Sequence, residues 1–243
     1  MRSLGRLLAL LLLCALALQA SFALRIAAMA WVPPQSTSFQ RSEAARLLRE
    51  HGRIEWAQQW VPYAQISPHL KRAVIASEDA GFTEHSGVEW DAIEKALEKN
   101  QRAEARAEKA QARNPDRPVA VKVVGGSTIT QQLAKNLFLS GERTVLRKAQ
   151  EFALTLMLET LLSKRRILEI YLNHVEWGEG LFGAQAAARH YFGKDAAQLG
   201  PLEAARLAVM LPAPKRFEKR PGSAYVRSRA ATIAARMAAV QPP

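Results

Sequence analysis

Residues 145–162 read VLRKAQEFALTLMLETLL, and they carry the clearest structural signal in this 243-residue chain. Their apolar residues recur at intervals of three and four, which places them on one broad face of a helix. The members of that face are Leu146, Ala149, Ala153, Leu156, Met157 and Leu161. This stretch therefore predicts an amphipathic α-helix.

The same helical period continues on both sides of this stretch. An earlier segment repeats it with Leu70, Ala73, Val74 and Ser77. Residues 167–172 and 202–211 give two more helical segments, and Pro201 suits the first turn of the second one. β-branched residues cluster only at 119–124, so strand signals are sparse. The sequence therefore predicts a mainly α fold.

Composition limits the kind of protein and of partner. Hydrophobic residues make up 49% and charged residues 23% of the chain, which allows a sizeable core. The net charge of +12 favours polyanionic partners, namely nucleic acid, anionic lipid headgroups or a pyrophosphate. One cysteine, Cys14, excludes a disulfide framework, and the five histidines lack the spacing of a zinc site. The sequence therefore predicts no metal ligated by cysteine or histidine.

The N-terminus predicts a membrane anchor. Arg2 and Arg6 precede the apolar residues 7–24, which only Gln19 and Ser21 interrupt. Eighteen helical residues reach about 27 Å, close to the thickness of a hydrocarbon core. The arginines place the N-terminus in the cytoplasm and the rest of the chain outside the cytoplasmic membrane, which argues against nucleic acid. A cleaved signal peptide is the alternative; the length of the run favours an uncleaved, single-pass anchor.

These features divide the chain into three parts. Residues 1–32 form a cytoplasmic tip and transmembrane anchor, residues 33–60 a linker and entry segment, and residues 61–235 the globular domain. Residues 94–117 are rich in alanine and charge with few large apolar side chains, which predicts a solvated helix or a mobile arm. We therefore place no site residue between positions 98 and 122.

The first candidate site follows a helix end. Residues 78–87 read EDAGFTEHSG, so the acidic pair Glu78 and Asp79 comes directly after an apolar helix. A carboxylate at the C-terminal end of a helix and among apolar neighbours resists ionisation, which suits a general base near neutral pH. An exposed acidic loop is the alternative interpretation.

The second candidate site begins another helix. Residues 125–136 read GGSTITQQLAKN, in which Ser127 and Thr128 are hydroxyl caps and the exposed N–H groups suit an anionic oxygen. Gln132, Lys135 and Asn136 lie about one turn apart and can present polar groups on one face. An ordinary capped helix start explains the pattern equally well.

Two further clusters are basic. In RKAQE (147–151), Arg147 and Glu151 share a helix face, which is also typical of a surface ion pair. KRRILEIYLN (164–173) combines a basic helix start with an apolar seam, so core packing with solvated charge is its simpler interpretation. Neither cluster alone predicts catalysis.

Together and in this order, the four clusters resemble the signature of the peptidoglycan glycosyltransferases, glycosyltransferase family 51, and most closely its monofunctional, membrane-anchored branch. The resemblance runs from about residue 65 to 229 and includes GEGLFG (178–183), YFGK (191–194), EAARLA (203–208) and LPAP (211–214). It implies a lysozyme-like, two-lobed helical domain over residues 61–235. Because no domain with a Ser-x-x-Lys nucleophile follows, transpeptidase activity is not expected.

The resemblance also implies a reaction and its residues. The enzyme would polymerise lipid II, with Glu78 as the base for the acceptor 4-hydroxyl, inversion at the sugar and release of polyprenyl pyrophosphate. Glu151 would orient the sugar–pyrophosphate region or a divalent ion such as Mg²⁺ or Mn²⁺, without an organic cofactor. The residues expected to bind pyrophosphate are Lys135, Arg143, Arg147 and Lys148. Those expected to donate hydrogen bonds around it are Ser127, Thr128, Gln132 and Asn136.

The expected partners are the growing glycan strand, the membrane and other wall-synthesis proteins. Two other functions stay open from the sequence. A glycan-cleaving lytic transglycosylase would share the fold and a catalytic glutamate, but its leaving group needs no cluster of cations. A membrane-tethered scaffold would retain the fold without catalysis, and the presence of both carboxylates argues against it.

Overall fold

A computed structural model describes residues 2–114, 125–142 and 144–243 of the chain. Within these residues lie eleven α-helices, three short strands and three 3-10 helices. The elements in chain order are α1 (Arg2–Ala28), α2 (Ser38–His51), β1 (Ala57–Gln58), η1 (Tyr63–Gln65), α3 (Pro68–Glu78), α4 (Trp90–Arg113), α5 (Ile129–Phe138), α6 (Val145–Leu161), α7 (Lys164–His174), β2 (Glu176–Gly178), β3 (Leu181–Phe182), α8 (Ala184–Phe192), η2 (Ala196–Gln198), α9 (Pro201–Met210), α10 (Pro214–Phe217), α11 (Ala224–Arg236) and η3 (Met237–Ala239). The mainly α prediction is confirmed, while the β-branched cluster at 119–124 lies outside the described residues.

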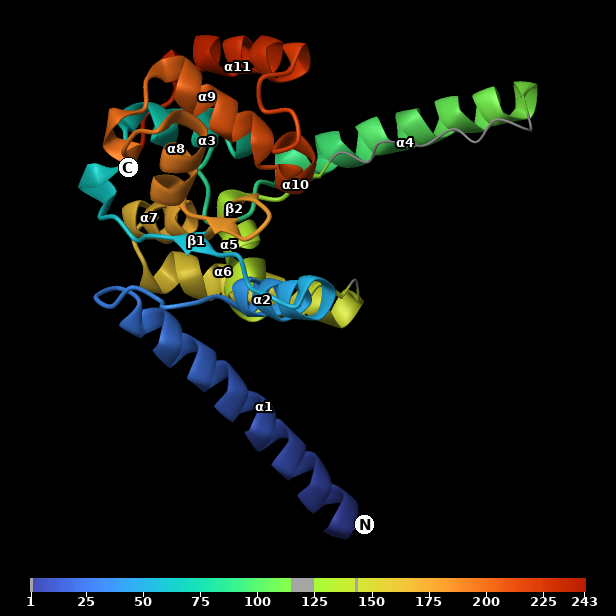
Figure 1. The fold of residues 1–243 in the computed structure, drawn as a ribbon. Coiled ribbons are helices and arrows are strands. Elements are labelled where there is room, and N and C mark those ends of the chain that lie inside the picture. Colours follow the sequence, from blue (N-terminus) through green and yellow to red (C-terminus); the bar gives the residue numbers. More distant parts are fainter. Residues whose placement is uncertain (1, 115–124, 143) are drawn as a thin grey trace.

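Helix α3 is the centre of one group of packed helices. The Ser67 hydroxyl accepts a hydrogen bond from the His69 N–H at 3.2 Å, and Pro68 occupies the first turn, so the helix begins with a side-chain cap. Its apolar face, with Leu70, Ala73 and Val74 fully buried, packs against α9 and α11. These three helices lie together in Figure 1, and their packing fixes where the C-terminal end of α3 lies.

A second group is built from α5, α6 and α7. Thr128 caps α5 by accepting a hydrogen bond from the Gln131 N–H at 3.2 Å, and the Gln131 side chain accepts one from the Thr128 N–H. The Thr144 hydroxyl caps α6 by accepting a hydrogen bond from the Arg147 N–H at 3.2 Å. Helix α5 packs against both α6 and α7, so the second and third sequence clusters belong to one unit.

The segment expected to be a linker and entry, residues 33–60, contains secondary structure. Helix α2 begins at a capping box of Thr37 and Gln40, and the side chain of its Glu43 pairs with Lys215 of α10. Strand β1 pairs in parallel with β3, which pairs antiparallel with β2. This three-stranded sheet joins the entry segment to the chain between α7 and α8.

Two helices extend away from the packed groups. Figure 1 shows α1 leaving the body on one side and α4 projecting from it on another. Helix α1 contains the span Ser3–Ala28, which is long and apolar enough to cross a membrane. Helix α4 covers most of the stretch predicted to be a solvated helix or a mobile arm, so residues 94–113 of that stretch are helical.

Candidate active site

Glu78 is the last residue of α3, and its half-buried carboxyl group is held by a side-chain amide. The Gln132 Nε2 of α5 donates a hydrogen bond to Glu78 Oε2 at 3.1 Å. Burial raises the pKa of Glu78, the hydrogen bonds from Gln132 and Ser77 lower it, and the nearby Asp79 carboxylate raises it, with a net rise above the ordinary value. Glu78 is therefore a carboxylate that readily takes up a proton.

A tyrosine orients the amide that holds Glu78. The Tyr171 hydroxyl of α7 donates a hydrogen bond to Gln132 Oε1 at 2.8 Å, which fixes the amide so that its nitrogen faces Glu78. Tyr171 is buried, and burial with the nearby carboxylates Glu78 and Asp79 raises its pKa well above the ordinary value. The tyrosine therefore keeps its proton and serves as a permanent donor.

Asp79 joins the first candidate cluster to the second. Its Oδ2 accepts a hydrogen bond from the Ile129 N–H, the first residue of α5, at 2.9 Å. Its Oδ1 lies 2.7 Å from His85 Nε2, and His85 Nδ1 accepts the Gly87 N–H at 3.0 Å, so Nε2 carries the proton toward Asp79. Asp79 thus fixes the start of α5, where Gln132 belongs to the second turn.

Gly87 closes this loop against α5 and α6. Its carbonyl oxygen accepts the Thr128 hydroxyl at 2.6 Å. Its φ of +86° lies in the region that favours glycine, and an added Cβ would lie 2.7 Å from Thr155 Cγ2. A side chain at this position would therefore separate the Glu78 loop from the helices that complete the site.

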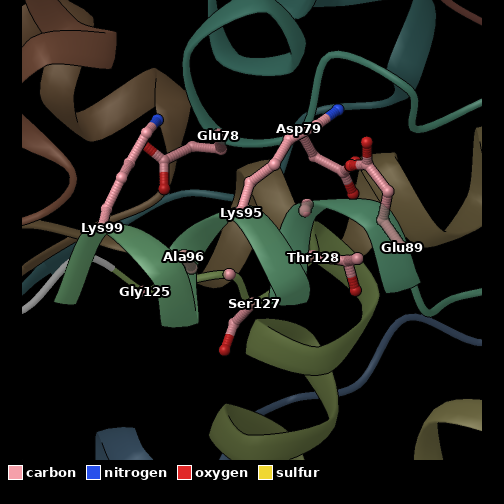
Figure 2. A pocket seen from close by; sticks show the side chains of 11 residues that line it. Glu78, Asp79, Glu89, Lys95, Ala96, Lys99, Gly125, Ser127 and Thr128 are labelled. Carbon is pink, nitrogen blue, oxygen red and sulfur yellow. The ribbon is translucent and has the colours of Figure 1, made fainter. Parts of the chain in front are cut away.

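A cleft lies between the end of α3, helix α4 and the start of α5 (Figure 2). Figure 2 shows the side chains of Lys95 and Lys99 extending from α4 toward Glu78 and Asp79. The residues that line the cleft are Glu78, Asp79, Glu89, Ala92, Lys95, Ala96, Lys99, Gly125, Gly126, Ser127 and Thr128. The carboxyl group with a raised pKa and two lysines therefore share one opening.

The second carboxylate, Glu151, has a different environment. It is buried in α6, where its Oε2 accepts a hydrogen bond from Arg147 Nη1 at 2.8 Å. Lys148 Nζ pairs with the other oxygen, Oε1. The Lys148 side chain is 53% exposed, so this cation remains accessible to an anionic ligand. The third cluster is therefore a carboxylate that organises two cations.

Two places in the described residues could be considered for a metal ion. One ligand atom each from Asp79, His85 and Glu89 lies within 4.8 Å of the others. However, both oxygens of Asp79 already accept hydrogen bonds from protein groups, and both oxygens of Glu151 pair with cations. A divalent ion would have to displace these partners, and the Mg²⁺ or Mn²⁺ expected at Glu151 stays a prediction.

Comparisons with known proteins decide the family. The family model described as Transglycosylase matches residues 44–238. The chain belongs to the transglycosylase family. A biosynthetic peptidoglycan transglycosylase of Bordetella pertussis is 53% identical over 214 residues, covering 88% of this chain and 84% of the relative. A relative with the same name from Janthinobacterium sp. is 50% identical, covering 93% of this chain and 90% of the relative. Another from Azoarcus sp. is 52% identical, covering 84% of this chain and 85% of the relative. These matches confirm the family and the enzyme class expected from the motifs.

The predicted site residues of this transglycosylase fall into two sets. Glu78, Ser127 and Thr128 line the cleft, and Gln132 contacts Glu78 directly. Thr128 is buried, with its hydroxyl bound to Gly87, so its role is structural. The second set is absent from the residues that line the cleft and comprises Lys135, Asn136, Arg147, Lys148 and Glu151. Arg143 lies outside the described residues.

Other residues of the transglycosylase site were missed from its sequence. Lys95 and Lys99 belong to a stretch whose composition predicts a solvated helix or a mobile arm, and the path of α4 beside the cleft brings them near Glu78. The apolar pattern around Tyr171 predicts core packing, whereas its hydroxyl orients Gln132. Asp79 was noted as part of an acidic pair, and the signal for its role was the histidine six residues later.

Proposed function

We propose that this chain polymerises lipid II into linear glycan strands, with Glu78 as the general base. The Glu78 carboxylate takes the proton from the 4-hydroxyl of the acceptor sugar, and the oxygen attacks the anomeric carbon of the lipid-linked strand. The bond to pyrophosphate breaks with inversion, and polyprenyl pyrophosphate leaves with the electron pair. The observation that carries this proposal is the raised pKa of Glu78 in a cleft, with Gln132 and Tyr171 holding it.

The negative charge of the leaving group needs fixed cations. In the proposal, Arg147 and Lys148 meet the diphosphate, and Glu151 holds both side chains in place. Lys135, on the exposed side of α5, adds a point charge, and Ser127 and Asn136 donate hydrogen bonds. The step requires only these groups and the two substrates, so no divalent ion is assigned a role in it.

Helix α1 suits the delivery of a lipid-linked substrate. We propose that it is an uncleaved anchor in the cytoplasmic membrane, with the catalytic domain on the outer face. The apolar span, the arginines before it and the packing of α1 against α6 support this proposal. Other wall-synthesis proteins stay expected partners, and nucleic acid does not.

The test is polymerisation of fluorescent lipid II by the detergent-solubilised full chain, with products separated by size. We expect a ladder of products that lysozyme digests, with or without added Mg²⁺. Degradation of preformed glycan without polymer would replace the proposal with a cleaving enzyme. Folded protein that binds lipid II but forms no product would replace it with a scaffold.

A further inference from the structure

The membrane-spanning helix contains a polar side chain that is paired with the catalytic domain. Gln19 interrupts the apolar run of α1 and lies five residues, or about 7.5 Å of helix, before Leu24 at the end of that run. Gln19 Nε2 donates to Gln150 Oε1 at 2.8 Å, and Gln150 Nε2 donates to Gln19 Oε1 at 3.1 Å. Two amides that satisfy each other in this way form a specific contact where lipid offers no alternative partner.

Aromatic and cationic contacts extend this pairing along α1. The Phe22 ring lies edge-on to Phe138 of α5 with centroids 5.3 Å apart, and the Arg25 guanidinium lies 5.1 Å from the same ring. Ile26 is fully buried, whereas Leu8 in the first half of α1 is 58% exposed. The second half of α1 is therefore packed on α5 and α6, and the first half extends away from them (Figure 1).

The paired residue of α6 lies among the proposed diphosphate-binding residues. Gln150 directly precedes Glu151 and follows Arg147 by three positions, which places all of them within about one helical turn. Glu151 faces the interior, and Gln150 faces α1. A displacement of α1 that the amide pair transmits to α6 would therefore move the backbone that carries Arg147 and Glu151.

We propose that Gln19 and Gln150 are positioning residues for transglycosylation, because they couple the membrane anchor to the diphosphate end of the site. The inference rests on the proposed function. The amide pair fixes α6 against α1 at one depth in the lipid, so that Arg147 and Lys148 meet the lipid-linked diphosphate where it leaves the membrane. The side-chain hydrogen bonds of Glu78 come from Ser77 and Gln132, and the amide of Gln132 is held by Tyr171, so the amide pair makes no direct contact with them.

The test is a double-mutant cycle in the full chain reconstituted in lipid vesicles, with Gln19→Leu, Gln150→Leu and the double variant. Each single variant leaves one amide unpaired, so we expect KM for lipid II to rise about three- to tenfold. Because Glu78 keeps its contacts, kcat should change by less than about twofold. The KM of the double variant should be no higher than the higher KM of the two single variants, because neither amide is then left unpaired.

The matched control is Ser21→Leu, the same kind of change on an exposed position of α1 two residues later. It should keep the KM of the parent chain. Unchanged KM in both single variants, or effects that multiply in the double variant, would overturn the inference. The same cycle on Tm reports the pair without activity: we expect a lower Tm in each single variant and no additive loss in the double. A parent chain without polymerase activity would instead reject the proposed function.

Discussion

Glu78 ends helix α3 and Glu151 lies in the first half of α6, and the surroundings of these two glutamates differ in kind. Glu78 is held by one neutral amide, and burial raises its pKa. Glu151 is buried between an arginine and a lysine, each of which neutralises one side of the carboxylate. A carboxyl group without a cationic partner can exchange a proton with substrate, whereas one that pairs with two cations holds their side chains in place.

The neighbours of Glu78 sharpen this contrast further. Asp79 is adjacent in sequence and is also buried, but both of its oxygens accept hydrogen bonds from the protein. Its contact with Ile129 spans 50 residues and joins α3 to α5. Glu78 is held less tightly: its oxygens accept one hydrogen bond of 3.1 Å from Gln132 and one long contact of 3.4 Å from Ser77, and its raised pKa belongs to a carboxyl group that lines the cleft.

The largest expected effect is at Glu78. Glu78→Gln retains the size of the side chain and a hydrogen-bonding oxygen but cannot take a proton, so kcat should fall by about 10²- to 10⁴-fold. Binding of lipid II should change little. The measurement is the initial rate of polymerisation beside equilibrium binding of fluorescent lipid II.

The control for this variant is Glu84→Gln, which removes an exposed carboxylate from the same loop. It should leave the rate unchanged. Near-normal turnover in Glu78→Gln would remove Glu78 from the reaction and break the comparison with Glu151.

A smaller effect is expected at Glu151. Glu151→Gln removes the negative charge that holds Arg147 and Lys148, and loss of charged hydrogen bonds of about 1.5–3 kcal/mol corresponds to about a 10- to 100-fold fall in kcat/KM. In the proposed function the two cations bind the diphosphate of the substrate, so KM should carry most of the change. Steady-state rates over a range of lipid II concentrations separate the two constants. A loss confined to kcat and as large as that of Glu78→Gln would show that the two glutamates share one role. The control is Glu142→Gln, which removes an exposed carboxylate and should leave both constants unchanged.

The smallest expected effect on catalysis is at Asp79, where stability should change instead. In Asp79→Asn an acceptor becomes an NH₂ donor that faces either the Ile129 N–H or His85, which should lower the free energy of unfolding by about 1–3 kcal/mol. Denaturation of the detergent-solubilised chain measures it, with the exposed Asp91→Asn as control. A variant that is fully stable yet inactive would make Asp79 a catalytic group.

Much of the fold follows from local sequence. The helix predicted at 145–162 is α6, and of the two hydroxyl caps expected at the start of α5, Thr128 is the N-cap, because period and caps depend on neighbouring residues. Which face of α6 is buried does not follow from the local sequence. Leu146 and Leu156 of its apolar face are 81% and 43% exposed, while Leu154 and Leu158 are buried. Periodicity identifies a face but not what covers it.

The site also has a part that local sequence predicts and a part that it does not. The position of Glu78 at a helix end was predicted from the chain around it, since an apolar run stops there. Its partner Gln132 is 54 residues away, and Tyr171 is 39 residues beyond that, so no local pattern connects them. Lys95 and Lys99 resembled a solvated helix face because composition does not reveal that α4 begins beside the cleft.

The most direct test of the central claim is the pH dependence of kcat/KM for lipid II polymerisation, in the parent chain and in Gln132→Leu. Glu78 acts as a base only when deprotonated, and its pKa is raised above 4.5, so the rate should fall at a pH above 4.5 as acid is added. Because Gln132 lowers that pKa, its loss should move the fall to still higher pH. A fall centred at or below pH 4.5, with no movement in Gln132→Leu, would contradict Glu78 as the base.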